Sequence, residues 1–484
     1  MDEKLINELR FLEISDISKT IDSICKFLEE ASIPQGKIIL SKLPEIIGKG
    51  NEKLIRELSI KMDEDKELIP QIVEVFGSLT LSAELSEKAR KSVVEKLKSA
   101  DLKDLPHLIK FLLQNTPSKD LALIIPQIRE KINLSDVKDK SEEEKRKKGF
   151  DLRKYEEDNT NKKLIFEFLF ASIKFNSKIA NQFYKQVEKD GESEVKEIDI
   201  WILLMLHSLE KFRKKLDSLV RKKVTLGIFK SSHFKNTFSN HASILVDYFE
   251  SASLMGALLL RSIEYEHQQV GAVIYQSSFL SFTDDFHRKE ILMNIMVHIG
   301  STSEKEIALG LESLLFLSKQ KGNPLKAYSS FVFSIFDYIE KFSFANVRKT
   351  FQIFCSFVYD IPPLSPSSSS SQKMLSSQSI PDPLKSIDNN TWNQLTLLIQ
   401  KQIANPNFQY KYMAIIGIVS IFSHFSLQRN FIGQFNPVYL NSAHSEEDDD
   451  QEEEEEEEDQ RIILFQNFSL FLFYFIIFII SLLY

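Results

Sequence analysis

The chain has 484 residues, of which 43% are hydrophobic, so it can bury a large core. Two distant cysteines, Cys25 and Cys355, exclude a disulfide framework and a cysteine-based zinc site, and they suit a reducing compartment. The formal net charge is −8, yet thirteen acidic residues lie between Glu446 and Asp459. Residues 1–445 therefore hold 60 basic and 56 acidic residues, a net charge of about +4.

The first 135 residues show the periodicity of amphipathic helices. Apolar residues recur at three- and four-residue spacing, as at Ile17, Ile21, Ile24 and Leu28. Helices are expected to begin near Ile17, Lys37, Lys53, Leu68, Leu85, Leu105 and Leu121. Two successive helices then occupy about 31–37 residues, close to the period of HEAT-type and tetratricopeptide arrays. Because such short helices bury their apolar stripes only by stacking, residues 1–134 are predicted to form a first helical solenoid.

Charge and composition divide the rest of the chain. Residues 135–163 carry many charges and few apolar side chains, which predicts an exposed loop or linker. Helical periodicity in residues 164–360 predicts a second helical solenoid, and residues 361–390 form a Pro- and Ser-rich linker. A helical pair is expected in residues 391–430. Period-2 alternation is nowhere sustained, so the predicted fold class is all-α, a HEAT- or armadillo-like α-solenoid of antiparallel helical pairs.

An acidic low-complexity segment, residues 445–460, precedes an apolar tail, residues 462–484. The 23 residues of the tail are long enough to cross a bilayer. Cytoplasmic flanks of membrane spans favour Lys and Arg, however, whereas here Arg461 follows thirteen acids. A membrane anchor is therefore not expected. The tail is interpreted as translated non-coding sequence or a gene-model artefact.

No motif for catalysis or cofactor binding stands out. The sequence has no Gly-rich phosphate loop, no G-x-S-x-G elbow and no H-E-x-x-H zinc motif. His287 and His298 are too far apart to share one helix face closely, and both are interpreted as core or surface histidines. The neighbouring carboxylates Asp284 and Asp285 are interpreted as a helix N-cap or a solvated turn. No catalytic residue, metal ligand or cofactor is therefore predicted.

A basic cluster is the clearest candidate for a binding site. The segment KFRKKLDSLVRKKV places seven cations within 13 residues, namely Lys211, Arg213, Lys214, Lys215, Arg221, Lys222 and Lys223. Phe212, Leu216, Leu219 and Val220 form the apolar stripe of the same helix, so the cations are expected to project into solvent. Two interpretations stay open, an ordinary solvated helix face and a ridge that contacts phosphates. No aromatic residue is interleaved for base stacking, so binding would follow the duplex backbone.

Several segments resemble one family, in the order in which they occur along the chain. They are SKLPEIIGKG (41–50), LKDLPHLIKFLLQ (102–114), IREKINL (128–134), VHIGSTSEKEIALGLESLLFL (297–317) and LLIQKQIANPNFQYKYMAIIGIVSI (397–421). From about Leu5 to Arg429, the chain is similar to the Fanconi anaemia group D2 protein family of DNA-repair scaffolds. These are packing segments, so the specificity of the resemblance comes from several matches in the same order.

The resemblance implies a nuclear α-solenoid that is not an enzyme. Family members pair with a paralogous solenoid, the Fanconi anaemia group I protein, and a RING-type ubiquitin ligase attaches one ubiquitin to them. The modified pair clamps duplex DNA during interstrand cross-link repair. The resemblance therefore implies these three partners for the present chain, and it implies DNA contact for the basic cluster between Lys211 and Lys223.

The sequence departs from the family in two respects. The family protein is much longer, and the resemblance ends before the acidic segment and the apolar tail. The family's acceptor lysine lies on a helix that corresponds to VGAVIYQSSFLSFTDDF (270–286), where it aligns with Gln276. An amide cannot form the isopeptide bond, and the nearest substitute, Lys289, lies about four turns further on if the helix continues. Ubiquitination in the family manner is therefore not expected.

Two further classes of protein stay open. A HEAT-like adaptor in transport or RNA processing would present the basic cluster only as solvated surface. A tail-anchored membrane adaptor would insert residues 462–484 into a bilayer. Salt-dependent binding to duplex DNA separates the repair scaffold from the first alternative, and membrane fractionation tests the second.

Overall fold

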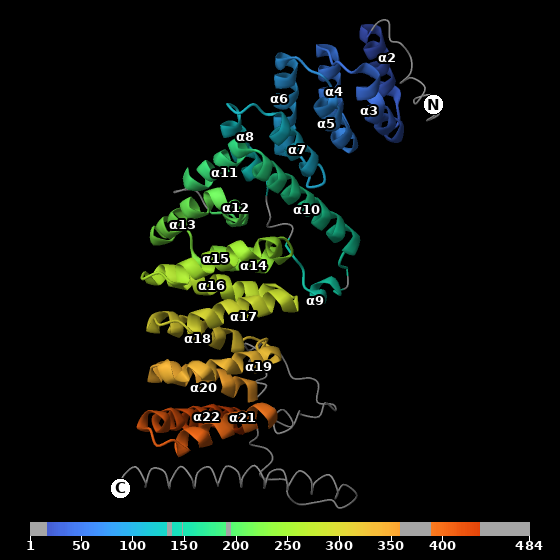
Figure 1. Cartoon of the computed structure of the whole chain (residues 1–484). Helices are drawn as coiled ribbons and strands as arrows, with labels where there is room; N and C mark the ends of the chain where they lie inside the picture. Colours follow the sequence, from blue (N-terminus) through green and yellow to red (C-terminus); the bar gives the residue numbers. More distant parts are fainter. Residues whose placement is uncertain (1–16, 133–137, 148, 190–194, 359–388, 436–484) are drawn as a thin grey trace, which may run out of the picture. The chain divides into compact units, whose positions relative to one another are not determined.

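Helices account for the regular structure of the described chain. The computed structural model describes residues 17–132, 138–147, 149–189, 195–358 and 389–435. Within these ranges the backbone forms α- and 3-10 helices and no strand, apart from an isolated bridge between Lys49 and Thr80. The predicted all-α solenoid is confirmed for this part of the chain (Figure 1). Residues 361–388 of the expected linker, and the acidic and apolar segments after residue 435, lie outside the described residues.

The N-terminal helices pack in two layers. They are α2 (Ile17–Glu30), α3 (Ile33–Ile47), α4 (Glu52–Glu64), α5 (Ile69–Ser78), α6 (Ala83–Ser99), α7 (Leu105–Asn115) and α8 (Leu121–Lys131). Contacts between α3, α5 and α7 make one layer, and contacts between α2, α4, α6 and α8 make the other (Figure 1). Each helix begins within four residues of its predicted start. The apolar periodicity therefore located these helices correctly.

Side-chain caps and buried stripes explain why these segments are helical. The Asn51 side chain accepts a hydrogen bond from the Leu54 N–H at 2.9 Å and starts α4. The Ser82 hydroxyl accepts one from the Leu85 N–H at 3.3 Å and starts α6. Behind each cap, apolar side chains at helical spacing are buried in the space between the layers.

The segment predicted to be a loop, residues 135–163, contains helices. A single turn, α9 (Glu142–Lys145), is followed by α10 (Leu152–Phe175), which begins twelve residues before the predicted second solenoid. The Asp151 side chain caps α10 by accepting a hydrogen bond from the Lys154 N–H at 3.1 Å. The first turns of α10 are rich in Lys, Arg and Glu, which favour helix without forming an apolar stripe. The prediction of a loop was wrong here because charge density does not distinguish a solvated helix from a linker.

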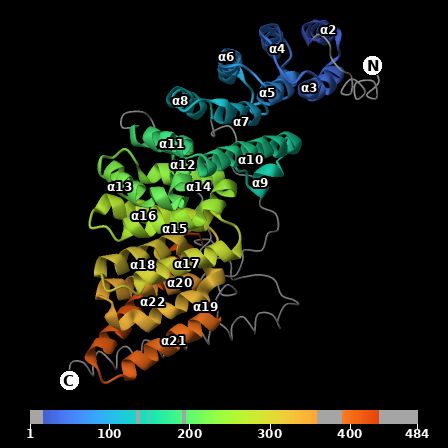
Figure 2. The same ribbon diagram turned by 45° about the horizontal axis from the view of Figure 1, so that its top comes forward.

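The same two-layer packing continues in the second half of the described chain. Its helices are α11 (Ser177–Lys189), α12 (Glu197–Ser208), α13 (Glu210–Thr225), α14 (Ser231–Leu245), α15 (Phe249–Leu260), α16 (Tyr265–Ser281), α17 (Asp285–Ile299), α18 (Glu304–Ser318), α19 (Ser329–Val332) and α20 (Phe344–Val358). Contacts run in series through α12, α14, α16, α18 and α20, and separately through α13, α15 and α17 (Figures 1 and 2). The helical pair expected in residues 391–430 is α21 (Asn389–Ala404) and α22 (Phe408–Phe435), and α21 packs on α20.

One described stretch, Ser231–Leu260, is long and apolar enough to cross a membrane by length and composition. It comprises α14, a 3-10 turn and α15, and a kink at His241 interrupts it. Half of its most apolar window is buried inside the protein. Phe234, Phe238 and Leu259 are completely buried, so these helices belong to the core of the solenoid.

Helices α15 and α16 cross closely. Gly271 of α16 lies against the backbone of α15, and a Cβ at this position would meet the Leu260 nitrogen at 2.7 Å and the Gly256 oxygen at 2.9 Å. Gly256 in turn lies against the Tyr275 ring, where a Cβ would be 3.3 Å from two ring carbons. Backbone cannot move aside as a flexible side chain can, so only glycine fits at position 271.

We predict that Gly271→Ala lowers the free energy of unfolding by about 1–3 kcal/mol, because the added methyl group forces α15 and α16 apart. Gly77→Ala is the matched control, since a Cβ there meets Phe111 at an ordinary 3.7 Å and alanine favours helix. The control should leave stability unchanged or raise it by up to about 1 kcal/mol. Chemical denaturation followed by circular dichroism measures both variants. Equal stability of the two variants would contradict the close approach inferred for this crossing.

Candidate nucleic-acid interface

Helix α13 carries the basic cluster, and its burial pattern follows from its periodicity. Phe212, Leu216 and Val220 lie on one face and are almost completely buried. That face packs against α12, α15 and α16. Glu210 in the first turn and basic residues in the last turn complement the helix dipole. Gly227, with φ of 71°, follows the helix and adopts the left-handed conformation that ends helices without strain.

Five cations of α13 are exposed and lie on the face opposite the core. They are Lys211, Lys214, Lys215, Arg221 and Lys222, and we call them the basic ridge. Their spacing of three, four and seven residues places them along one stripe, together with the exposed Ser218 and Thr225. At 1.5 Å per residue, the ridge is about 17 Å long. A ridge of this length can meet several phosphates of one strand, which are about 3.4 Å apart along the duplex axis.

Lys223 does not belong to the ridge, and the expectation that it is exposed was wrong. Its side chain is 3% exposed, its ammonium group donates a hydrogen bond to the Val187 carbonyl of α11, and it lies 5.4 Å from the centre of the Phe229 ring. Position 223 comes three, four and seven residues after the buried Val220, Leu219 and Leu216, so it falls on the core face. Lys223 is therefore a packing residue that joins α13 to α11.

Arg213 and the residues beneath the ridge join α13 to α12. Arg213 is half-buried, and its Nε donates to the His207 carbonyl at 3.5 Å. The His207 Nε2 lies 3.1 Å from the Asp217 carboxylate. Burial lowers the pKa of His207 from its usual value, although the Asp217 carboxylate opposes this shift. His207 is therefore neutral at pH 7 and adds no charge beneath the ridge.

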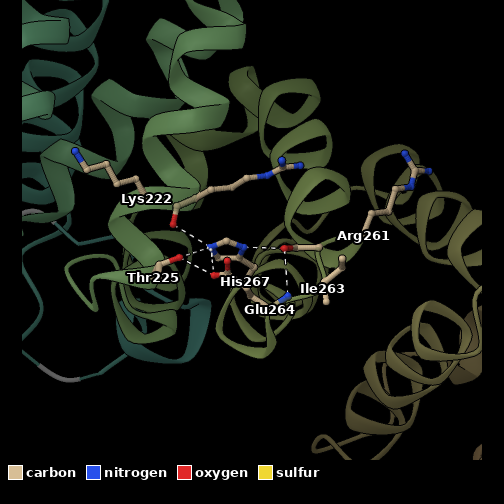
Figure 3. Close-up of a pocket in the computed structure, with 8 residues that line it drawn as sticks. Lys222, Thr225, Arg261, Ile263, Glu264 and His267 are labelled. Atoms are coloured by element: carbon tan, nitrogen blue, oxygen red, sulfur yellow. Dashed lines mark hydrogen bonds and ion pairs between the residues drawn. The ribbon is translucent and has the colours of Figure 1, made fainter.

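A hollow of about 510 Å³ lies at the C-terminal end of the ridge. It is lined by Arg221, Lys222, Thr225, Arg261, Ser262, Ile263, Glu264 and His267. The first three belong to α13, and the others belong to the α15–α16 turn and the start of α16. Figure 3 shows Lys222 and Arg261 at opposite sides, with Thr225, His267 and Glu264 between them. Sequence reasoning did not group Arg261 with the ridge, because 39 residues separate it from Lys222.

Gln276, the residue aligned with the family's acceptor lysine, lies on α16 and is half-buried. Its Nε2 lies 3.5 Å from the Ser313 hydroxyl of α18. Lys289 is exposed, but it lies on α17 and pairs with Asp285 at 2.5 Å. The helix does not continue from Gln276 to Lys289, since α16 ends at Ser281 and α17 begins at Asp285, so the separation of four turns does not apply.

The described residues contain no group of three or more His, Cys, Asp or Glu side chains that could hold a metal ion. Asp284 is the N-cap of α17 and accepts a hydrogen bond from the His287 N–H at 2.9 Å, which confirms its interpretation as a cap. His298 is buried between the Tyr275 hydroxyl at 3.2 Å and the Glu306 carboxylate at 2.6 Å. Both histidines named in the sequence analysis therefore have structural partners.

In the described residues, fold and surface together define a helical-repeat protein with an exposed basic face on α13. A family model described as "Fanconi anaemia protein FancD2 nuclease" matches residues 1–462, and the chain belongs to this family. The match extends beyond Arg429, where the resemblance was expected to end, and it includes the acidic segment. The family match therefore covers residues 445–460, which the resemblance was expected to leave out.

Curated relatives give the same family name. The chain is 24% identical over 438 residues to the Fanconi anemia group D2 protein of Gallus gallus, which covers 88% of this chain and 29% of the relative. It is 25% identical over 429 residues to the homolog of Mus musculus, which covers 86% of this chain and 28% of the relative. The chain thus spans less than a third of the length of these relatives.

Solved structures are only remotely similar. An engineered protein covers 87% of this chain and 94% of its own, at 12% identity and a TM-score of 0.24. Yeast importin-β (Kap95p) covers 85% of this chain and 52% of its own, at 10% identity and a TM-score of 0.27. Similarity this low carries no argument about function, so the helices described above define the fold.

The exposed ridge makes a prediction for duplex DNA. A variant that lacks four ridge cations should bind duplex DNA more weakly, and the loss of affinity should be the same for unrelated DNA sequences. It carries the substitutions Lys214→Ala, Lys215→Ala, Arg221→Ala and Lys222→Ala. The slope of log K against log salt should become shallower by about 0.9 for each phosphate that is no longer neutralised. Stability should change by no more than about 0.5 kcal/mol per site, because the side chains are exposed. Fluorescence anisotropy over a salt series measures the slope.

Two controls accompany this experiment. The first control loses the same charge outside the ridge and should keep the wild-type slope. It carries the substitutions Lys66→Ala, Lys88→Ala, Lys91→Ala and Lys98→Ala. Lys223→Ala should also keep the slope but lose about 1–3 kcal/mol of stability, because it removes a buried donor from the Val187 carbonyl. A slope that falls equally in the ridge variant and the first control would assign the ridge to ordinary solvated surface.

Proposed function

We propose that this chain is a scaffold of Fanconi anaemia DNA repair in the nucleus, which binds duplex DNA through the basic ridge and pairs with the group I solenoid. Membership of the family supports the repair role. The exposure of five cations along one stripe of α13 is the observation that carries DNA binding. In a transport or RNA-processing adaptor the same cations would be only solvated surface, and salt-dependent binding to duplex DNA separates the two functions.

The chemistry of the ridge favours contact with the phosphate backbone. Lysine and arginine neutralise phosphates and release counterions, and this contact does not depend on base sequence. The aromatic residue of the cluster, Phe212, is 3% exposed and cannot stack on a base. The proposed ligand is therefore a duplex, held by its charge and shape.

A metal-dependent nuclease is the second candidate, because the description of the matching family model contains that word. Metal-dependent cleavage of a phosphodiester needs metal ions that stabilise the attacking and leaving oxygens. The described part of the chain offers no group of three or more carboxylate, histidine or cysteine side chains for such an ion. Following the scaffold role that family membership supports, we propose that the chain acts without catalysis. Cleavage of duplex or branched DNA by the purified chain with Mg²⁺ or Mn²⁺ would favour the nuclease instead.

Pairing with the group I solenoid predicts a stable complex. Coexpression of the two chains should raise the solubility of this chain and give a one-to-one complex in size-exclusion chromatography. An unrelated HEAT-repeat protein of similar size is the control and should elute separately. Failure of the two solenoids to co-elute at micromolar concentration would count against the proposed pairing.

A second prediction concerns ubiquitin. With the RING-type ligase of the family, the wild-type chain should stay unmodified because Gln276 has no amine. Gln276→Lys should restore modification, because it supplies an amine at the acceptor position. The substitution replaces a half-buried side chain whose amide lies 3.5 Å from the Ser313 hydroxyl. Mass spectrometry of the modified site provides the measurement.

The control for this experiment is Lys289→Arg, which removes the nearest amine on α17 and keeps its charge. With Lys289→Arg added, the wild-type chain should stay unmodified and the Gln276→Lys chain should still be modified. If the wild-type chain is modified and Lys289→Arg abolishes this modification, the acceptor is Lys289 and the alignment with Gln276 is wrong.

A further inference from the structure

The hollow at the end of the basic ridge joins two helical pairs. We propose that it is a phosphate clamp, in which Arg221 of α13 and Arg261 of the α15–α16 turn together hold one backbone phosphate of duplex DNA. This inference rests on the proposed DNA binding by the ridge. It extends the path of the duplex from α13 onto the next helical pair and adds Arg261 to the contact residues.

Positive charge dominates the lining of the hollow. Arg221, Lys222 and Arg261 contribute three cations, and Glu264 contributes the one carboxylate among the described lining residues. The two arginines come from different elements, so they can approach one phosphate from two sides. Planar guanidinium groups match phosphate geometry through paired hydrogen bonds, which a single lysine cannot provide. Arg221 belongs to both the ridge and the hollow, so the two sites are continuous.

A network of hydrogen bonds around His267 holds the α15–α16 turn in place. The His267 Nε2 lies 2.9 Å from the Arg221 carbonyl, and its Nδ1 lies 2.8 Å from the Ser262 hydroxyl (Figure 3). Because a carbonyl can only accept, Nε2 carries the proton and donates it to the Arg221 carbonyl. Gln268 Nε2 also donates to the Ser262 carbonyl at 2.7 Å. The backbones that carry both arginines are therefore linked before any ligand arrives, which lowers the entropy cost of binding.

The helix ends around the hollow favour an anion. Helix α16 begins at Tyr265, directly after the lining residue Glu264, and the first N–H groups of a helix attract negative charge. The C-terminus of α13 would repel an anion through its last carbonyls. These carbonyls already accept hydrogen bonds. The Arg221 carbonyl accepts one from His267, the Lys222 carbonyl one from the Leu226 N–H, and the Val224 carbonyl one from the Gly227 N–H. The repulsive end is thereby shielded, and the attractive end remains.

The carboxylates near the hollow are engaged by protein partners. Glu264 accepts a hydrogen bond from the Thr225 hydroxyl at 2.6 Å. Glu306 lies 3.3 Å from the Arg261 Nε and 2.6 Å from the His298 Nδ1. Arg261 itself is 55% exposed, so its guanidinium can meet a phosphate while its Nε faces Glu306. Glu306 lines a smaller hollow on the α18 side, so this contact holds Arg261 at the boundary of the two hollows that it lines.

The surroundings favour a long nucleic acid as the source of the phosphate. Ridge cations continue from the hollow in one direction along α13. In the other direction, Arg261 also lines a smaller hollow of about 110 Å³ together with the exposed Lys305. A single small phosphate compound would use none of these flanking cations. A duplex backbone would meet them in succession.

The clamp is tested with the full chain and a fluorescent 20-base-pair duplex over a salt series. Arg221→Ala and Arg261→Ala should each make the slope of log K against log salt shallower, and the double variant should lose about 0.9 in total, the value for one phosphate. Lys214→Ala/Lys215→Ala should lose about 1.8, the value for two phosphates. Arg56→Ala, an exposed arginine of α4, should keep the wild-type slope.

Three outcomes would overturn the clamp. An unchanged slope in Arg261→Ala, at unchanged thermal stability, would show that the hollow holds no phosphate although the ridge binds DNA. A loss of about 1.8 in the double variant would assign the arginines to separate phosphates. Absence of duplex binding by the wild-type chain would overturn the proposed function, and the clamp with it.

Glu264→Gln provides a test of opposite sign. The amide oxygen still accepts the Thr225 hydrogen bond, but the negative charge at the hollow is removed. Duplex affinity at low salt should rise about two- to fourfold, because a phosphate held nearby no longer faces a carboxylate. Glu57→Gln, which removes a carboxylate of α4 beside Arg56, should leave the affinity unchanged. Equal affinities of Glu264→Gln and wild type would contradict the clamp.

Discussion

The packing of α13 against α12, α15 and α16 fixes which of its cations can meet a ligand. A helix repeats every 3.6 residues, so burial of Phe212, Leu216 and Val220 turns one stripe inward and leaves the opposite stripe in solvent. The same constraint buries Lys223, whose charge serves the contact with α11. The basic ridge exists because neighbouring helices hold α13 in one rotation.

Contacts between neighbouring helical pairs then decide how far the positive surface extends. The close crossing of α15 and α16 at Gly271 places the turn between them beside the end of α13. His267 joins that turn to the Arg221 carbonyl, so Arg261 lines the same hollow as Arg221. Residues from two helical pairs thereby form one surface. This is the arrangement by which repeat proteins build extended binding faces from short units.

The sequence predicted those features that depend on local periodicity. Helix starts such as Ile17, Leu105 and Leu121 coincide with the observed ones, because an apolar stripe and a helix share one period. The start of α10 was missed because its first turns carry charges and no stripe. The burial of Lys223 was missed although its spacing from Leu216 and Val220 indicated the core face, because its charge was given more weight than its position.

Features that depend on tertiary packing could not be predicted from the sequence. Arg261 and Lys222 are distant in the chain, and only the stacking of α13 beside the α15–α16 turn brings them to one hollow. The break between α16 and α17 likewise depends on the Asp284 cap, which places Lys289 on a different helix from Gln276. The capping role of Asp284 was visible in the sequence, but the position of Lys289 relative to Gln276 was not.

The salt dependence of duplex binding by the unaltered chain is the decisive measurement. Four lysines of the ridge, together with the arginine pair that shares one phosphate, would neutralise five phosphates, so the slope of log K against log salt should be about −4.5. Binding should be equally tight for duplexes of unrelated sequence, since phosphates carry no sequence information. A slope near zero, or affinity that depends strongly on base sequence, would contradict binding of the duplex backbone by the ridge.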